Sequence, residues 1–274
     1  MRLRRPILAL LLAPALLAWG EKGHRAATSL AVKGLPPELA AWYAGREVRL
    51  REAAPEPDAW KAHDRKEGPR HYLDVELYGK PGDIPREAAV ALAHVGGATF
   101  QKAGTVPWVV QDGYRQLVAA FRAGDAAKVA DQSAWLGHYV ADLHVPLHTT
   151  TNHDGQLTGQ RGVHARWESG LVERYLDEAA LVAAPAAPED PAKAPWQWLE
   201  ESFALIPQLL ADDQEASRGE AREQPTRSVG YWRNFWALQG PVVERRVIQS
   251  GQRMAGLWLS AWIEAGRPKA PASR

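Results

Sequence analysis

Histidine and acidic residues occur at helical spacing in the middle of the chain. His138 and Asp142 are four residues apart, and His164 and Glu168 repeat that interval sixteen residues after His148. Residues four apart lie on one face of a helix. The proline two residues before His148 ends the first helix and lets this side chain approach from another direction. Such a nitrogen and oxygen donor set suits zinc, so the spacing predicts a metal site.

The N-terminal part of the chain contains four further candidate ligands. Asp58 and His71 flank a polar loop, and His24 lies five residues after Trp19. A free α-amino group has a pKa of about 7.7–8.0, so near neutral pH its neutral form is available to bind zinc. Taken singly, each residue has an ordinary alternative: a surface histidine, a loop aspartate or a core tryptophan.

The N-terminus has the features of an export signal. Three arginines precede an apolar run over residues 7–18, which is too short to cross a bilayer but suits a signal-peptide core. We predict a signal peptide over residues 1–18, cleavage before Trp19 and an exported protein, periplasmic or secreted. A buried N-terminal helix is the alternative, but it explains the arginines poorly. No later stretch approaches about 20 apolar residues, so we expect no stable membrane anchor.

The composition excludes several classes of protein. With 274 residues, 46% hydrophobic and 24% charged, the chain is not disordered throughout. The absence of cysteine excludes a disulfide scaffold and a cysteine nucleophile. Removal of Arg2, Arg4 and Arg5 leaves 30 basic against 32 acidic residues, a net charge of −2. A nucleic-acid substrate would therefore need metal ions to supply the positive field.

The elements that position these side chains are predicted to be helices. Apolar periodicity predicts an all-α fold, a single helical domain over residues 19–265 with a flexible tail over 266–274. Residues 71–77 alternate and are expected to be extended, and residues 53–57, 149–162 and 183–195 are expected to be loops. Helices are predicted over residues 23–33, 37–45, 85–103, 109–123, 126–144, 163–181, 196–217 and 229–264.

Several motifs occur in a family-specific order. They are WGEKGH at 19–24, DAWK at 58–61, HYLD at 71–74, HYVADLHVPLH at 138–148 and VHARWE at 163–168. In this order they resemble the type I single-strand-specific nucleases of fungi, plants and bacteria, which share a superfamily with zinc-dependent phospholipase C. The resemblance covers roughly residues 19–262 and implies an all-α domain with a trinuclear zinc cleft.

The resemblance implies three zinc ions and distributes the ligands among them. One site would comprise Asp58, His71, His138 and Asp142; a second would comprise Trp19 through its amine and carbonyl, His24 and a bridging Asp142; the third would comprise His148, His164 and Glu168. The implied activity is hydrolysis of single-stranded DNA and RNA to 5′-phosphate products, with 3′-nucleotidase activity. Nucleic acid or nucleotides would be the partners.

The resemblance also implies roles for residues that do not bind metal. Lys61, with Asp58, is a candidate catalytic residue, and Lys61 stands where the nucleases have arginine. Tyr72 and Asp74 are candidate base contacts, with core packing and a strand-end hydrogen bond as alternatives. His144 is expected to support the ligands rather than bind zinc. His63, His94 and His153 match nothing in the family and are expected to be surface residues.

Two other functions remain open. Glu168 occupies a position where the nucleases usually have aspartate and phospholipase C has glutamate, so hydrolysis of choline-type phospholipids is the alternative activity. A zinc-scavenging or inactive module is a third possibility, although the complete ligand set and the absence of histidine-rich repeats speak against it.

Overall fold

The structure is a computed structural model that describes residues 20–220 and 227–271. The predicted signal peptide and Trp19 lie outside the described residues.

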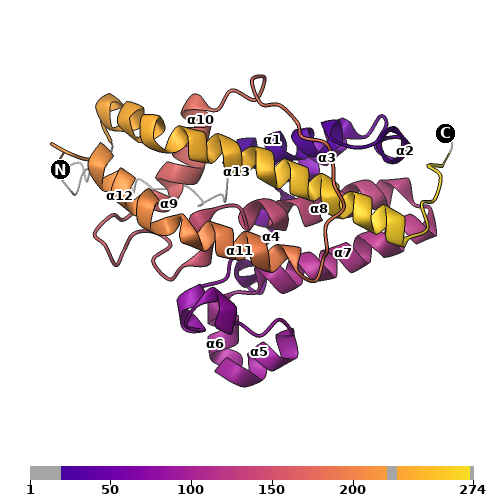
Figure 1. The fold of residues 1–274 in the computed structure, drawn as a ribbon, viewed down its shortest axis with the longest axis horizontal. Coiled ribbons are helices and arrows are strands. Elements are labelled where there is room, and N and C mark those ends of the chain that lie inside the picture. Colours follow the sequence, from indigo (N-terminus) through magenta and orange to yellow (C-terminus); the bar gives the residue numbers. More distant parts are fainter. Residues whose placement is uncertain (1–19, 221–226, 272–274) are drawn as a thin grey trace, which may run out of the picture.

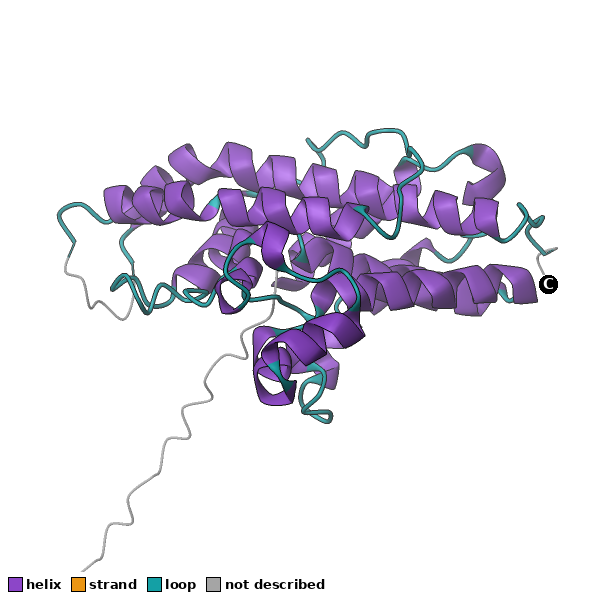
Figure 2. Ribbon diagram, turned by 60° about the horizontal axis from the view of Figure 1, so that its bottom comes forward, coloured by secondary structure: helices purple, strands orange, loops and turns teal. Residues whose placement is uncertain are grey.

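Helices form almost all the regular structure of the described residues, and no strand is present among them (Figure 2). The α-helices are α1 (Gly20–Lys33), α2 (Pro37–Ala40), α3 (Glu47–Ala53), α4 (Glu56–Trp60), α5 (Ala88–Val95), α6 (Gly97–Ala103), α7 (Val106–Ala123), α8 (Ala126–Asp142), α9 (Val163–Ala165), α10 (Val172–Tyr175), α11 (Ala194–Ala204), α12 (Ile206–Ala216) and α13 (Val229–Glu264). Shorter helical turns are η1 (Gly68–Arg70), η2 (Val75–Leu77), η3 (Pro81–Asp83), η4 (Pro146–Thr149) and the π-helical η5 (Arg166–Leu171). The predicted all-α fold is confirmed.

The long helix α13 is the centre of the packing. It runs along the long axis of the molecule and packs against α1, α7, α8 and α12 (Figure 1). Ser228 caps its start by accepting a hydrogen bond from the backbone N–H of Tyr231. Trp167 and Trp258 are among the largest side chains in the fully buried core. The helices α5 and α6 project from this body as a separate lobe (Figure 1).

The hairpin of α7 and α8 has a local cause in the sequence. Gly124 ends α7 in the left-handed conformation, with φ of 71°. Asp125 then caps α8, because its carboxylate accepts a hydrogen bond from the backbone N–H of Lys128. Two consecutive residues thus stop one helix and start the next, which fixes the start of the helix that bears His138 and Asp142.

Some predicted helices are broken where glycine or proline intervenes. The helix expected over residues 85–103 is two helices, because Gly96 adopts φ of 80° between α5 and α6. The helix expected over 196–217 is interrupted at Leu205, and Pro207 occupies the first turn of α12. The helix expected over 163–181 ends earlier, at Tyr175.

Two segments near the candidate site differ from the sequence-based prediction. Residues 71–77 do not form a strand: Leu73 makes an isolated antiparallel bridge with Gly104, and η2 follows. Alternating apolar residues form a strand only when a partner strand is available, and none is present among the described residues. The loop expected over residues 53–57 ends at Pro55, because α4 starts at Glu56.

The described part of the C-terminal tail is attached to the helical body. The carbonyl oxygen of Pro268 accepts hydrogen bonds from Nε1 of Trp42 at 3.0 Å and Nε1 of Trp262 at 2.9 Å. Pro268, which lies in the tail predicted over residues 266–274, therefore contacts the helical body, and the flexibility of that tail stays a prediction. The division of the chain into one domain over residues 19–265 stays a prediction.

Candidate metal centre

Helix α8 supplies two buried donors to the centre of the site. His138 and Asp142 are both fully buried, and His138 Nε2 lies 3.3 Å from Asp142 Oδ2. His138 Nδ1 is 2.8 Å from the carbonyl oxygen of Ala54, which can only accept a hydrogen bond. Nδ1 therefore bears the proton, and the lone pair of Nε2 faces the site.

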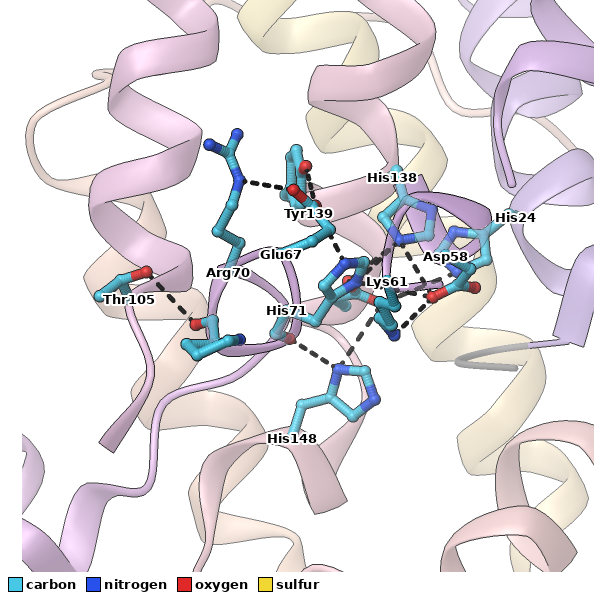
Figure 3. Close-up of polar contacts among 12 residues, drawn as sticks. His24, Asp58, Lys61, Glu67, Arg70, His71, Thr105, His138, Tyr139 and His148 are labelled. Carbon is cyan, nitrogen blue, oxygen red and sulfur yellow. Dashed lines mark hydrogen bonds and ion pairs between the residues drawn. The ribbon is translucent and has the colours of Figure 1, made fainter. Parts of the chain in front are cut away.

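His71 and Asp58 face the same point from two other elements. His71 follows η1, and its Nδ1 lies 2.9 Å from Asp142 Oδ2, 3.0 Å from His138 Nε2 and 3.6 Å from Asp58 Oδ1 (Figure 3). Metal–donor bonds of about 2.0–2.1 Å in a tetrahedron place neighbouring donors about 3.3 Å apart. Asp58, His71 and His138 thus form a cluster of the size that holds a zinc ion.

His24 on α1 forms a second cluster with His138 and Asp142. Its ring is fully buried and stacks on His138 at 4.0 Å, and neither ring nitrogen has a hydrogen-bond partner. Burial, and next the neighbouring His138, lower the pKa of His24 to about 3, so the ring is neutral. Its Nε2 is 3.7 Å from Asp142 Oδ1, which also lacks a hydrogen-bond partner. Buried polar atoms without partners are costly, and a metal ion between them would satisfy both.

The third cluster joins η4 to the helical segment that starts with α9. His148 Nδ1 donates to the carbonyl oxygen of His71 at 2.9 Å, which leaves Nε2 facing Glu168 Oε2 at 3.4 Å. His164 Nε2 lies 3.1 Å from the same oxygen. Burial alone would raise the pKa of Glu168, but His164 and His148 lower it to about 2. These three residues share no member with the other two clusters.

The donor set fits zinc in type as well as in distance. Asp58, Asp142 and Glu168 are buried carboxylates, and each faces imidazole nitrogens. Burial disfavours the charged form of Asp142, yet His138 and His148 hold its pKa well below the usual range. Nitrogen and oxygen donors without thiolates suit zinc.

A cavity of about 410 Å³ opens beside the clusters. Lys61 lines it, with Nζ 2.6 Å from Asp58 Oδ1. Tyr72 is half-buried in the wall and donates a hydrogen bond to the carbonyl oxygen of Lys102 at 3.3 Å. Burial, and next the charge of Glu76, raise the pKa of Asp74 to about 7. The cavity thus combines a cation, an aromatic face and a carboxyl group whose charge changes near neutral pH.

The remaining histidines occupy three kinds of environment. His63 and His94 are exposed, in agreement with the prediction. His153 is exposed too, but it lines the cavity, and its ring centroid is 6.3 Å from that of His164. The prediction that it is a surface residue is therefore confirmed, and the structure adds that this residue borders the cavity. His144 is fully buried, donates to the carbonyl oxygen of Val140 at 2.7 Å and accepts from Arg253 at 3.0 Å.

Sequence reasoning missed two residues at the site. Glu67 lies 3.1 Å from His71 Nε2, and Lys102 lines the cavity beside Asp74. The interval of four residues between Glu67 and His71 was a usable signal, because it equals the interval in the two pairs that were identified. Nothing in the sequence places Lys102, since α6 reaches the cavity only through tertiary packing.

The comparisons with known proteins agree with this geometry. A family model described as S1/P1 nuclease matches residues 19–263, which is most of the chain. No curated protein matches the chain. Among the described residues, none of the helices is both long and apolar enough to span a bilayer. The chain belongs to the S1/P1 nuclease family, and it is a hydrolytic enzyme of the nuclease or phosphodiesterase type.

Proposed function

We propose that the chain is an exported, zinc-dependent phosphodiesterase that hydrolyses single-stranded DNA and RNA to 5′-phosphate products and also acts as a 3′-nucleotidase. One observation carries the proposal. His71 and the whole third cluster line the same cavity as Lys61, Tyr72 and Asp74. A phosphodiester at the clusters would therefore place its neighbouring nucleoside against an aromatic side chain.

Three zinc ions are assigned to the three clusters. Asp58, His71, His138 and Asp142 would hold one ion, and His24 and Asp142, with the amine and carbonyl of Trp19, would hold the second. His148, His164 and Glu168 would hold the third. Zinc in such sites supplies Lewis acidity to phosphoryl oxygens and lowers the pKa of water.

Residues of this chain would bind and orient the substrate. Lys61 brings a positive charge to the phosphate, although a lysine lacks the two-pronged geometry of arginine. Tyr72 offers its ring to an unstacked base, and Asp74 offers hydrogen-bonding oxygens to the edge of that base. A base within a duplex is stacked and paired, so single strands should be preferred.

Parallel turnover assays with one zinc-loaded preparation test the substrate class. The substrates are single-stranded DNA, RNA, duplex DNA and phosphatidylcholine vesicles. We expect turnover of the single strands and much slower turnover of the duplex. Preferential hydrolysis of phosphatidylcholine would instead support the phospholipase C alternative, which Glu168 favours on sequence grounds.

The variant Tyr72→Ala tests the proposed base contact. It should raise KM for nucleotides but not for bis-nitrophenyl phosphate, which has no base to stack. Equal losses of activity on both substrates would make Tyr72 a structural residue.

The proposed role of Trp19 gives a test of processing. An amide nitrogen has no available lone pair, so a chain extended before Trp19 lacks that ligand. We expect exported protein starting at Trp19 to bind more zinc and to have higher diesterase activity than protein with extra N-terminal residues. Mass spectrometry establishes each N-terminus first. Equal zinc content and equal rates in the two forms would rule out the amine as a ligand.

A further inference from the structure

A buried carboxylate outside the ligand set contacts one of the candidate ligands. Glu67 is 4% exposed, and its Oε1 lies 3.1 Å from His71 Nε2 (Figure 3). Tyr139 donates its hydroxyl to the same oxygen at 2.5 Å, and Arg70 Nε lies 3.3 Å from Oε2. The Tyr139 hydroxyl, the His71 ring and the ion-paired guanidinium of Arg70 thus surround the carboxyl group, and an ionised carboxylate suits all three neighbours.

Each ring nitrogen of His71 lies beside a carboxylate, Nε2 beside Glu67 and Nδ1 beside Asp142. A neutral imidazole has one N–H, and a carboxylate accepts but cannot donate. With a zinc ion at the clusters, Nδ1 would offer the metal its lone pair, and the N–H would be on Nε2. Glu67 is the acceptor that favours this tautomer.

The same carboxylate joins two parts of the chain that supply ligands. Arg70 immediately precedes His71, and Tyr139 immediately follows His138 on α8. Arg70 also lies over the ring of Tyr139, 5.2 Å from its centroid. Glu67 consequently contacts residues that are adjacent in sequence to both His71 and His138. Nδ1 of His71 and Nε2 of His138 are 3.0 Å apart.

The other oriented ligands depend on neutral partners. His138 Nδ1 donates to the carbonyl oxygen of Ala54, and His148 Nδ1 donates to that of His71. Main-chain carbonyls fix the tautomer but bring no charge. In the part of the chain that the structure describes, His71 is the candidate ligand whose second nitrogen faces a carboxylate from outside the three clusters.

We propose that Glu67 is a positioning residue that fixes the tautomer of His71 and strengthens it as a zinc ligand. A negative charge beyond the imidazole increases the basicity of the ligating nitrogen, and loss of such a partner typically weakens metal binding by about 10–100-fold. The inference rests on the proposed zinc site, but it does not depend on which phosphodiester is the substrate.

Zinc affinity separates this role from general stabilisation. In a His164→Ala background, which disables the third cluster, competition with a chromophoric chelator reports on the remaining sites. We expect Glu67→Gln to weaken zinc binding there by about tenfold or more, because the amide keeps an acceptor but removes the charge. Asp213→Asn is the matched control: Asp213 is buried and bonded to Tyr231 and Arg166, but it contacts no candidate ligand.

The Tm of each metal-free protein is measured in parallel. Asp213→Asn should lower Tm and leave zinc affinity unchanged. Equal affinities of the Glu67→Gln and parent proteins would overturn the proposal, as would an equal loss of affinity in Asp213→Asn. If Glu67→Gln does not fold, Tyr139→Phe provides the test, because it removes one hydrogen bond to Glu67. This variant should weaken zinc binding by a smaller factor. Unchanged zinc affinity would overturn the proposed role of Glu67.

Failure of the zinc site itself has a different outcome. If the parent protein binds no zinc, the proposed function fails and Glu67 has no metal ligand to orient. If the parent binds zinc and the Glu67 variants bind it equally well, the site stands and the role of Glu67 alone is refuted.

Discussion

Asp142 is the side chain that links the candidate metal sites, because its two oxygens face different partners. Oδ2 lies 2.9 Å from His71 Nδ1 and 3.3 Å from His138 Nε2, whereas Oδ1 lies 3.7 Å from His24 Nε2. His148 belongs to the separate third cluster. The two residues should therefore differ in how many metal ions depend on them.

Asp142→Asn should lower zinc content by more than one ion and abolish most turnover, because a neutral amide replaces the shared carboxylate. His148→Ala should lose only the ion of the third cluster, while turnover also falls. Metal analysis of both purified variants, beside the parent protein, tests the division of ligands. The same zinc loss in both variants would contradict it.

The raised pKa of Asp74 should make the stability of the folded state depend on pH. Burial and Glu76 raise its folded-state pKa from 3.8 to about 7, so the folded state binds a proton that the unfolded state releases. The protonated carboxyl contributes its full stability below pH 4, and this contribution is lost as pH rises to 7. Asp74→Asn removes the titration, so its Tm should rise relative to the parent more at pH 8 than at pH 5. A difference in Tm that is constant with pH would count against this account.

The close approach of α1 to α13 places His24. A Cβ atom on Gly251 would lie 2.7 Å from Leu30 Cβ and 2.8 Å from the carbonyl oxygen of Ala27, both on α1. A side chain at this point must separate the two helices, and His24 would move with α1. Glycine is therefore required here for close helix packing rather than for its backbone conformation.

Gly251→Ala should destabilise the protein by about 1–3 kcal/mol, as overpacking commonly does, and should weaken zinc binding at the cluster that includes His24. Gly230→Ala in the same helix is the control, because its nearest contact would be Ser228 Oγ at 3.4 Å. Denaturant unfolding and zinc titration of both variants provide the comparison. Equal stability of the two variants would show that the α1–α13 contact can relax.

The candidate ligands connect segments that are distant in sequence. Donors come from six segments: α1, α4, the segment after η1, α8, η4 and the helical segment over α9 and η5. Ions bound between them would cross-link the fold, and their binding free energy would add to the stability of the folded state.

Chelation of the native protein should therefore lower Tm and abolish activity together, and re-addition of zinc should restore both. Metal analysis of active protein should find about three zinc ions per chain, one for each donor cluster. Active protein with one ion or none would refute the trinuclear assignment.

Local sequence patterns were enough to predict the helical fold and the candidate ligands within each helix. An interval of four residues fixes two side chains on one face, so His138 with Asp142 and His164 with Glu168 followed from local geometry. The helix breaks at Gly96 and before Pro207 were also local, although the prediction overlooked them.

The way in which distant segments meet depends on packing between elements. Residues 71–77 have the alternation of a strand, but a strand needs a partner, and Gly104 offers a single bridge. His153 and Lys102 reach the cavity because separate loops and helices pack there. Glu67 reaches His71 where Tyr139 and Arg70 also contact its carboxylate. Side-chain spacing along one helix is set by the backbone, whereas contacts between elements depend on packing that no local pattern encodes.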